Sequence, residues 1–389
     1  MKVLYLGHYR EGTGWAQAAQ DYILAMDSVG IDVVCRNIQL THKYEDVPER
    51  ILELEQNSYK DCDVCIQHVL PHHLVGTKRF KKNIAYFVSE STSIKPTSWF
   101  NHLQTVDQVW VPNQELLSGL VSDNLFPDEP DRVKLVPHTF SMDKYQSDNT
   151  FVKGINQSGM RQYRPMHIQE LDYKFKFYYV GDLNDRKNIE SIVTAFHSEF
   201  DTSEPVGLIL KVKKFGLLPE QIESITRSMC DTIKGKLRMY KDLSQYHQEA
   251  IIPVEMSEED ICSLHHYGDC FVCVSHGEGW SIPSFEAMCF GSTPICSDTG
   301  GPQDFISDDP ATGTLIGGTR CVCDCEDSAF PELFTGREEW FLPSESELKK
   351  AMRYYYENHG KLDPTAGIRR AKKFSYKSVG NQIKEILEN

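Results

Sequence analysis

The chain has 389 residues, of which 40% are hydrophobic and 25% are charged, a composition typical of folded globular proteins and not of disordered ones. A chain of this length favours two domains over a single core. The formal net charge of −15 disfavours DNA or RNA as a partner, because proteins that bind nucleic-acid phosphates carry a basic surface.

The N-terminal residues and the cysteines predict a cytoplasmic location. Residues 1–7 are too short an apolar stretch for a secretory signal peptide and lack a cleavage site of small residues. No apolar run approaches the roughly 20 residues of a membrane-spanning helix. Most of the 12 cysteines lie in apolar segments, as Cys270 and Cys273 do, which favours buried reduced thiols over a disulfide framework. The sequence leaves the oligomeric state open.

The first half of the chain alternates apolar strands with helices. Residues 3–6 form an apolar run without polar alternation, as expected of a strand that is buried on both faces. A turn-rich loop from Gly7 to Gly14 then leads into a helix over residues 15–28. Further strands are expected over residues 32–35, 64–66, 84–88, 109–111 and 133–136. This alternation predicts a parallel sheet wrapped by helices.

The pattern stops over residues 137–172, which are polar and show no sustained periodicity. We interpret this segment as a connection between two domains. We expect one domain over residues 1–165, a second over 166–365 and a C-terminal helical segment over 366–389.

The second half repeats the alternation. A strand over residues 175–180 is followed by a loop that begins at Gly181 and by a helix over 188–200. Further strands are expected over residues 208–212, 250–252, 271–274 and 293–296, and further helices over 257–267, 284–290, 345–359 and 366–387. The fold class is therefore α/β, with two successive doubly wound parallel-sheet units.

Two loops that join a strand to a helix carry candidate functional residues. In residues 275–288, Glu278 lies in the loop and Glu286 lies one turn into the helix, so both carboxylates can face one ligand. The backbone N–H groups at this helix start are donors for an anion. The alternative is structural, with Glu278 as a helix cap and Glu286 as a solvated residue.

The second loop, residues 180–188, places Arg186 and Lys187 near a helix start. Cations are unfavourable there unless an anionic ligand is present, so this placement favours phosphate binding. The alternative is a solvated basic turn.

The two loops together resemble a known family. Within residues 276–301, HGEGWSIPSFEAMCFGSTPICSDTGG, Glu278 and Glu286 resemble the Glu-x7-Glu sugar-nucleotide signature of retaining glycosyltransferase family 4. The similarity extends to residues 105–120, 134–145 and 177–200. It spans most of the chain and is weakest over residues 35–80 and 145–170.

The resemblance implies the GT-B fold, in which two Rossmann-like domains face an inter-domain cleft and the C-terminal helix returns to the N-terminal domain. It implies that Glu286 binds the ribose hydroxyls of a nucleoside diphosphate and that Glu278 contacts the sugar. It also implies that Lys187, assisted by Arg186, neutralises the departing diphosphate. Residues at the start of the helix are implied to hold hydroxyls or phosphate: Gly279, Ser281, Ile282 and Ser284.

In the first domain, Gly14 lies in the Gly12-Thr13-Gly14 loop, which resembles the family's glycine-rich turn. This loop is not a G-x-G-x-x-G motif, and the next strand ends in Cys35-Arg36 without an acidic residue, so an NAD site is not expected. Family members often carry a histidine near the reacting sugar, and here Glu90 occupies that neighbourhood. His68 is a competing candidate, which we interpret as a pocket-lining or structural histidine.

Four other sequence patterns are not interpreted as functional sites. Residues 61–63 match Asp-x-Asp but lead into a buried strand, and Cys62 and Cys65 lie at its edge. The alternating cysteines of residues 321–325 do not have the usual zinc spacing. The basic residues 78–82 are expected to be a solvated face, with contact to an anionic acceptor or to a membrane surface as the alternative.

Together with the residues above, the resemblance to this family implies a metal-independent glycosyltransferase without a cofactor, and the resemblance alone implies retention of the anomeric configuration. The expected donor is a UDP- or GDP-sugar, with its base near residues 254–257, and the expected acceptor is a hydroxyl of a glycan or glycoconjugate. Two alternatives remain at this stage: a glycosyltransferase that acts on modified DNA bases, which the net charge disfavours, and a non-catalytic sugar-nucleotide-binding subunit.

Overall fold

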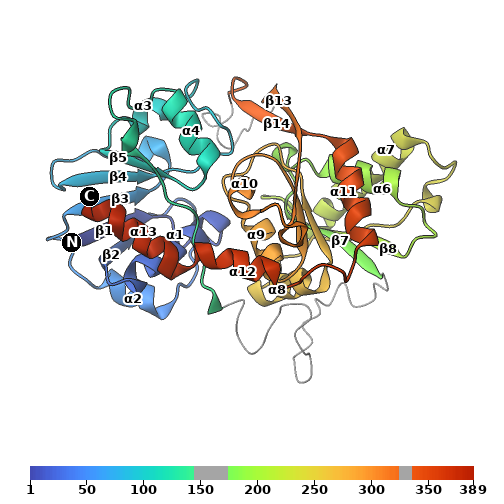
Figure 1. The fold of residues 1–389 in the computed structure, drawn as a ribbon, viewed down its shortest axis with the longest axis horizontal. Coiled ribbons are helices and arrows are strands. Elements are labelled where there is room, and N and C mark those ends of the chain that lie inside the picture. Colours follow the sequence, from blue (N-terminus) through green and yellow to red (C-terminus); the bar gives the residue numbers. More distant parts are fainter. Residues whose placement is uncertain (144–173, 324–334) are drawn as a thin grey trace. The chain divides into compact units, whose positions relative to one another are not determined.

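The computed structural model describes residues 1–143, 174–323 and 335–389 (Figure 1). The chain divides into a first unit of Met1–Lys144, Val322–Glu339 and Lys372–Asn389, and a second unit of Tyr145–Cys321 and Trp340–Ala371. The boundary expected between residues 165 and 166 lies outside the described residues.

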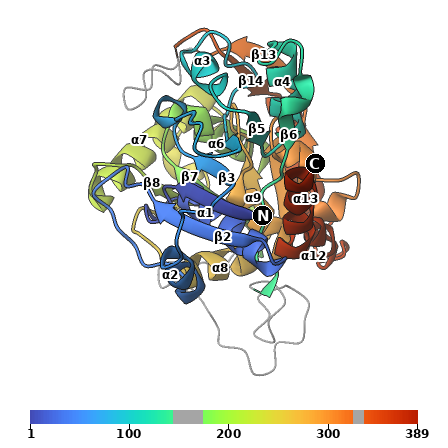
Figure 2. The same ribbon diagram turned by 90° about the vertical axis from the view of Figure 1, so that its left-hand side faces the viewer.

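The first unit contains a parallel sheet of six strands in the order β2-β1-β3-β4-β5-β6, and Figure 2 shows β1, β2 and β3 of this sheet in blue. The strands are β1 (Lys2–Gly7), β2 (Asp32–Asn37), β3 (Val64–His68), β4 (Lys82–Tyr86), β5 (Gln108–Val111) and β6 (Val133–Leu135). The prediction of these six strands is confirmed. β4 ends at Tyr86 and not at Val88, because its ladder with β5 ends at the pair of Tyr86 with Trp110.

Helices pack on this sheet in two separate buried clusters. They are α1 (Gly14–Ser28), α2 (Glu49–Glu55), α3 (Trp99–Leu103), α4 (Gln114–Ser122) and α13 (Tyr376–Glu388). α1 and α13 pack against each other, with Ile23, Val379 and Ile383 in one cluster. Gly380 allows this close approach, because a Cβ there would lie 2.5 Å from the carbonyl oxygen of Ala25.

The C-terminal segment is not the continuous helix expected over residues 366–387. α12 (Ala366–Ala371) is followed by a 3-10 turn over Lys372–Phe374. α13 begins after Ser375, whose hydroxyl accepts a hydrogen bond from the N–H of Ser378 at 3.3 Å. Serine favours this capping position over a helix interior, which explains the break.

The second unit contains another six-stranded parallel sheet, in the order β12-β11-β10-β7-β8-β9. The strands are β7 (Phe175–Asp182), β8 (Val206–Lys213), β9 (Ala250–Ile252), β10 (Cys270–Cys273), β11 (Thr293–Ser297) and β12 (Thr314–Ile316). This is the strand order of dinucleotide-binding Rossmann folds. The order reverses at β7 and β10, which pair directly, and we call this place the switch point.

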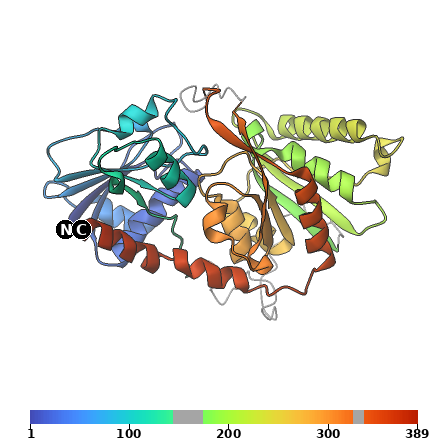
Figure 3. The ribbon, with the colours of Figure 1, turned by 45° about the horizontal axis from the view of Figure 1, so that its top comes forward.

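Helices cover both faces of this second sheet. They are α6 (Ile189–Glu199), α7 (Pro219–Leu237), α8 (Glu258–Tyr267), α9 (Ile282–Cys289), α10 (Pro302–Phe305) and α11 (Glu345–Glu357). Side chains of α6, α7 and α11 share one buried cluster with alternate residues of β7 and β8. The backbones of these helices can be followed in Figure 3, where α7 is yellow and α11 is red. β13 (Gly318–Val322) and β14 (Glu339–Pro343) form a two-stranded sheet. In the described ranges, no helix combines the length and the apolar character that crossing a bilayer requires.

A buried ionic cluster joins α6, α7 and the start of β9. The ammonium of Lys234 lies 2.8 Å from Oε1 of Glu249, and the ring of His197 hydrogen-bonds the same carboxylate. Burial alone would raise the pKa of Glu249, but the bonds and charges of His197 and Lys234 lower it to about 2. The carboxylate is therefore ionised and depends on these two partners.

Replacing Lys234 by methionine is expected to lower the free energy of unfolding by about 3–5 kcal/mol, because the change leaves a buried carboxylate without its ammonium partner. Equilibrium urea unfolding measures this loss. Lys236→Met, at an exposed position of the same helix, is the matched control and is expected to stay within about 0.5 kcal/mol. Equal losses in the two variants would contradict the assignment.

Candidate functional site

The candidate site lies at the switch point of the second unit. In doubly wound sheets, ligands bind outside the carboxyl ends of the strands where the strand order reverses. The loop after β7 carries Arg186 and Lys187 in a 3-10 turn, Asp185–Lys187, and the loop after β10 carries Glu278. The two motifs that the sequence singles out therefore follow the two strands that flank the switch point.

Backbone and side-chain hydrogen bonds hold these two loops together. The N–H of His276 donates to the carbonyl of Arg186 at 2.8 Å, and the side-chain amide of Asn188 donates to the carbonyl of Val274 at 3.1 Å. The guanidinium of Arg186 donates to the carbonyl of Gly277 at 2.7 Å. The loops after β7 and β10, which lie about 90 residues apart in sequence, are thus fixed to each other.

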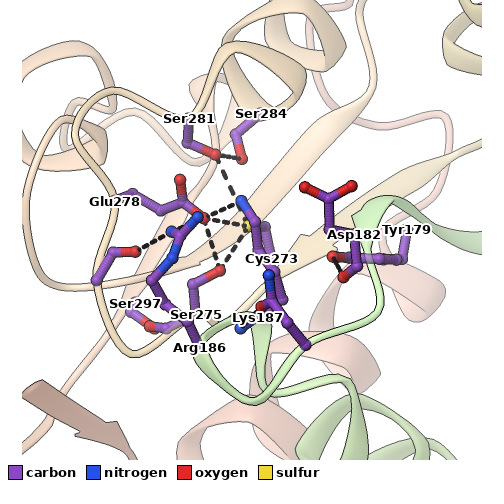
Figure 4. Close-up of polar contacts among 12 residues, drawn as sticks. Tyr179, Asp182, Arg186, Lys187, Cys273, Ser275, Glu278, Ser281, Ser284 and Ser297 are labelled. Atoms are coloured by element: carbon purple, nitrogen blue, oxygen red, sulfur yellow. Dashed lines mark hydrogen bonds and ion pairs between the residues drawn. The ribbon is translucent and has the colours of Figure 1, made fainter. Parts of the chain in front are cut away.

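The carboxylate of Glu278 is the centre of the site (Figure 4). The ammonium of Lys187 donates to its Oε1 at 2.6 Å, the hydroxyl of Ser275 donates to the same oxygen at 2.7 Å, and the guanidinium of Arg186 lies 3.5 Å away. These contacts, and the longer one from the thiol of Cys273, all involve Oε1. Within the described part of the chain, the structure shows no such contact for Oε2 of Glu278, so this oxygen can accept a hydrogen bond from a ligand.

The environment of Glu278 keeps it ionised. Its burial would raise the pKa of the carboxyl, but the charges of Lys187 and Arg186 and the hydrogen bonds from Lys187 and Ser275 outweigh burial and lower the pKa to about 2. With two cations against one carboxylate, this group of three side chains carries a net positive charge.

This arrangement contradicts two alternatives that the sequence left open. Glu278 does not cap α9, which has no side-chain cap. The carboxylate of Glu278 instead pairs with Arg186 and Lys187. Arg186 and Lys187 are also not a solvated turn, since both are partly buried against Glu278. Their position at a helix start is explained by that carboxylate and does not by itself require a phosphate.

The start of α9 has an unusual backbone. Ser281 adopts a left-handed conformation with φ of 69°, which is uncommon for a residue other than glycine. Its hydroxyl lies 2.6 Å from that of Ser284. α9 begins at Ile282, two residues before the expected start, with Pro283 in its first turn, where proline costs no hydrogen bond. Backbone strain of this kind is concentrated at functional sites.

Gly300 and Gly301 pack directly against the loop that carries Glu278. A Cβ at Gly300 would lie 1.9 Å from the carbonyl oxygen of Glu278, and a Cβ at Gly301 would lie 2.3 Å from the Cα of Trp280. Gly300 also has a positive φ of 66°. Only glycine allows this chain to pack directly against the loop that carries Glu278.

Glu286 lies on α9, with 13% of its side chain exposed, and its Oε2 lies 3.7 Å from Nε2 of His265 on α8. The other ring nitrogen of His265 lies 2.9 Å from the hydroxyl of Tyr178 on β7. No sequence pattern indicates His265, because its contact with Glu286 depends on how α8 and α9 pack.

The first unit contains the remaining candidates. Gly14 is the exposed first residue of α1, after Thr13, which caps that helix. Glu90 lies half-buried in the loop after β4. His68 ends β3, is fully buried, and hydrogen-bonds Tyr5 at 2.8 Å and the indole of Trp15. Burial lowers the pKa of His68 well below its usual value, which favours the structural interpretation; the role of Glu90 stays a prediction.

The other sequence patterns have ordinary surroundings in the structure. Asp63 pairs with Lys81 at 2.8 Å, and Cys62 and Cys65 pack in a small apolar cluster. No group of three or more metal-ligating side chains occurs in the ranges that the structure describes. Cys325 lies outside those ranges.

Comparison with known proteins gives a family match for the second unit. Residues 167–320 match the family model described as Glycosyl transferases group 1. The sequence matches no curated protein. Over these residues the chain is therefore similar to the group 1 glycosyltransferases; membership of glycosyltransferase family 4 and the Glu-x7-Glu signature stay predictions.

Solved structures match the whole chain. HepE from Anabaena in complex with UDP and glucose matches with a TM-score of 0.65 at 14% identity and covers 100% of this chain and 99% of that one. WaaG, a glycosyltransferase involved in lipopolysaccharide biosynthesis, matches with 0.60 at 13% identity, covering 99% of each chain. The catalytic domain of starch synthase IV from Arabidopsis thaliana, bound to ADP and acarbose, matches with 0.61 at 12% identity and covers 99% and 98%. These matches confirm the GT-B type of fold, with two Rossmann-like domains.

The low pKa of Glu278 predicts a pH-dependent contribution to stability. Because the pKa falls from 4.5 to about 2 on folding, the stabilisation is complete above pH 4.5 and is lost as the pH falls toward 2; it amounts to about 3 kcal/mol. The difference in unfolding free energy between the wild type and Glu278→Gln should therefore shrink by about this amount from pH 6 to pH 2 in urea titrations.

Glu357→Gln, an exposed change on α11, is the control and should show no comparable trend. If the difference in unfolding free energy between the wild type and Glu278→Gln stays constant with pH, then Arg186 and Lys187 do not hold the carboxylate ionised.

Proposed function

We propose that this protein is a retaining glycosyltransferase that moves a sugar from a nucleoside diphosphate to an acceptor hydroxyl without a metal ion. The observation that carries the proposal is the pair of cations, Arg186 and Lys187, held by buried Glu278 at the switch point. The match to glycosyltransferases over residues 167–320 supports the reaction class. The HepE complexes with UDP and with UDP-glucose support a nucleotide sugar as the donor.

The two cations match the charge that develops in such a reaction. When the bond from the sugar to the diphosphate breaks, the leaving phosphate oxygens gain negative charge. Arg186 and Lys187, together with the N–H groups at the start of α9, stabilise that charge from fixed positions. Because Glu278 already holds the ammonium 2.6 Å away, little reorganisation is needed when the diphosphate departs.

The two carboxylates would bind the other parts of the donor. Oε2 of Glu278 accepts a hydrogen bond from a sugar hydroxyl while Oε1 stays with Lys187. Glu286 accepts hydrogen bonds from the ribose hydroxyls, with His265 beside it. Backbone groups of Gly279, Ser281, Ile282 and Ser284 complete the donor site.

The proposed reaction occurs on one face of the sugar. The bond from C1 to the diphosphate oxygen breaks, the acceptor oxygen bonds to C1 from the same face, and the acceptor proton passes to the leaving phosphate oxygen. The configuration at C1 is retained, and no side chain forms a covalent intermediate. The protein contributes positioning and electrostatic stabilisation.

The proposed acceptor is a hydroxyl of a glycan or glycoconjugate. Gly14 and Glu90 in the first unit are the proposed acceptor-side residues, on the resemblance of their segments to the family. The net charge of −15 disfavours modified bases of DNA as the acceptor.

The test is donor binding and turnover by the purified full chain over a panel of UDP- and GDP-sugars. At a donor concentration 100 times the Kd, binding stabilises the fold by about 2.7 kcal/mol, which a thermal shift detects. Glu286→Gln is expected to weaken donor binding about 10- to 100-fold, because it removes hydrogen bonds to a charged group, and to abolish measurable donor hydrolysis and transfer.

Glu357→Gln is again the control and should bind and turn over the donor as the wild type does. A wild type that binds a nucleotide sugar and turns over none would support the non-catalytic subunit instead. A wild type that binds no nucleotide sugar would overturn the proposal.

A further inference from the structure

We propose that Lys211 selects the base of the donor: its ammonium donates a hydrogen bond to the carbonyl at C4 of uracil or C6 of guanine. Cytosine and adenine carry an amino group at these positions. The inference rests on the proposed function and adds to it a residue that distinguishes two classes of nucleotide.

Lys211 lies near the carboxyl end of β8, at the edge of the sheet where the donor site is placed. It is in register with Val180 of β7 and Ile252 of β9. Leu210 and Val212 point into the cluster with α6 and α7, and side chains alternate along a strand. Lys211 therefore points to the opposite face of the sheet, as Tyr178 does. This face bears α8 and α9, because Tyr178 contacts His265 of α8, which lies beside Glu286 of α9.

The Lys211 side chain is unusual because it is buried and has no acceptor among the residues that the structure describes. Only 5% of the residue is exposed, and over the described ranges the structure shows no hydrogen bond or ion pair to its ammonium. Its burial lowers the pKa of the ammonium to about 8. A buried ammonium without a partner is costly, and a ligand that supplies an acceptor removes that cost.

The charges around Lys211 favour a neutral acceptor over a phosphate. Lys213 pairs with Asp182 at 3.8 Å, and the carboxylates of Asp182 and Glu255 both act on Lys211 electrostatically. Two lysines and two carboxylates leave no net positive charge to attract a second anion. A base with a carbonyl next to a ring N–H fits better, because the ammonium donates to the carbonyl and a carboxylate accepts from the N–H.

The strand order places a nucleoside over this region. In Rossmann folds of this order, a mononucleotide lies over the first three strands, and a side chain after the second strand contacts it. β7, β8 and β9 are these three strands here. Val254 and Met256, both half-buried, follow β9 and offer apolar contacts for a base.

The fold does not determine the base. One similar structure is bound to UDP and another to ADP. The choice must come from side chains, and Lys211 interrupts an otherwise apolar strand, 206–212, at the end that faces the site.

The experiment measures the Kd of UDP, CDP, GDP and ADP for the full chain by calorimetry. The wild type is expected to bind UDP at least about 10-fold more tightly than CDP, and it is expected to bind GDP at least about 10-fold more tightly than ADP. In CDP and ADP the carbonyl that accepts a hydrogen bond from the ammonium is replaced by an amino group that faces the ammonium. Lys211→Met is expected to reduce each ratio below about 3-fold, chiefly through weaker binding of UDP and GDP.

Lys214→Met, an exposed change in the same segment, is the control and should keep the wild-type ratios. Lys211→Gln retains a hydrogen-bond donor, so it should keep part of the UDP-to-CDP and GDP-to-ADP ratios if the Lys211 contact is a hydrogen bond. If Lys211 were merely structural, its replacement would change all four Kd values together. Equal binding of UDP and CDP by the wild type, or unchanged ratios in Lys211→Met, would overturn the inference and leave the proposed function intact. Failure of all four nucleotides to bind would overturn the proposed function itself.

Discussion

The ion pair between Lys187 and Glu278 is the interaction on which the site depends. It connects the loop after β7 to the loop after β10 at the point where the second sheet reverses its strand order. Without the carboxylate, Lys187 would lose the acceptor that lies 2.6 Å from its ammonium. Without the cations, a buried carboxylate would lose its ion-pair partners, and each of these changes costs several kcal/mol. The two loops therefore stabilise each other's position.

The surrounding chain is shaped to keep this pair in place. Gly300 and Gly301 pack their backbone against Glu278 and Trp280 at distances that exclude any side chain. Ser281 holds a left-handed backbone that turns the chain into α9. In the described part of the chain, the hydrogen bonds to the carboxylate of Glu278 all go to Oε1, so the residue can hold the cations and still present an acceptor. One carboxylate can thus have both a structural and a ligand-binding role.

Much of the architecture could be predicted from the sequence, because buried parallel strands are continuous apolar runs that are easily recognised. α7 was not predicted. Its buried face includes Ile222, Thr226 and Cys230, which give only a weak apolar period. The break before α13 was also missed, although Ser375 is a typical capping residue.

The motif residues of the site were found from their spacing, but their contacts were not. The pairing of Lys187 with Glu278 joins residues 91 positions apart, and no local pattern encodes it. His265 depends on the packing of two helices in the same way. Lys211 did leave a signal, a lysine inside an apolar strand, whose meaning becomes clear only when the register shows what lies beside it.

The most direct test of the account is ³¹P NMR of a nucleoside diphosphate bound to the full chain and to Lys187→Met. We expect the β-phosphate resonance to shift on binding to the wild type, because Lys187 and Arg186 contact it, and we expect the variant to bind about 10- to 100-fold more weakly with a smaller shift. The same affinity and the same β-phosphate shift in both proteins would contradict the assignment of this ion pair as the diphosphate site.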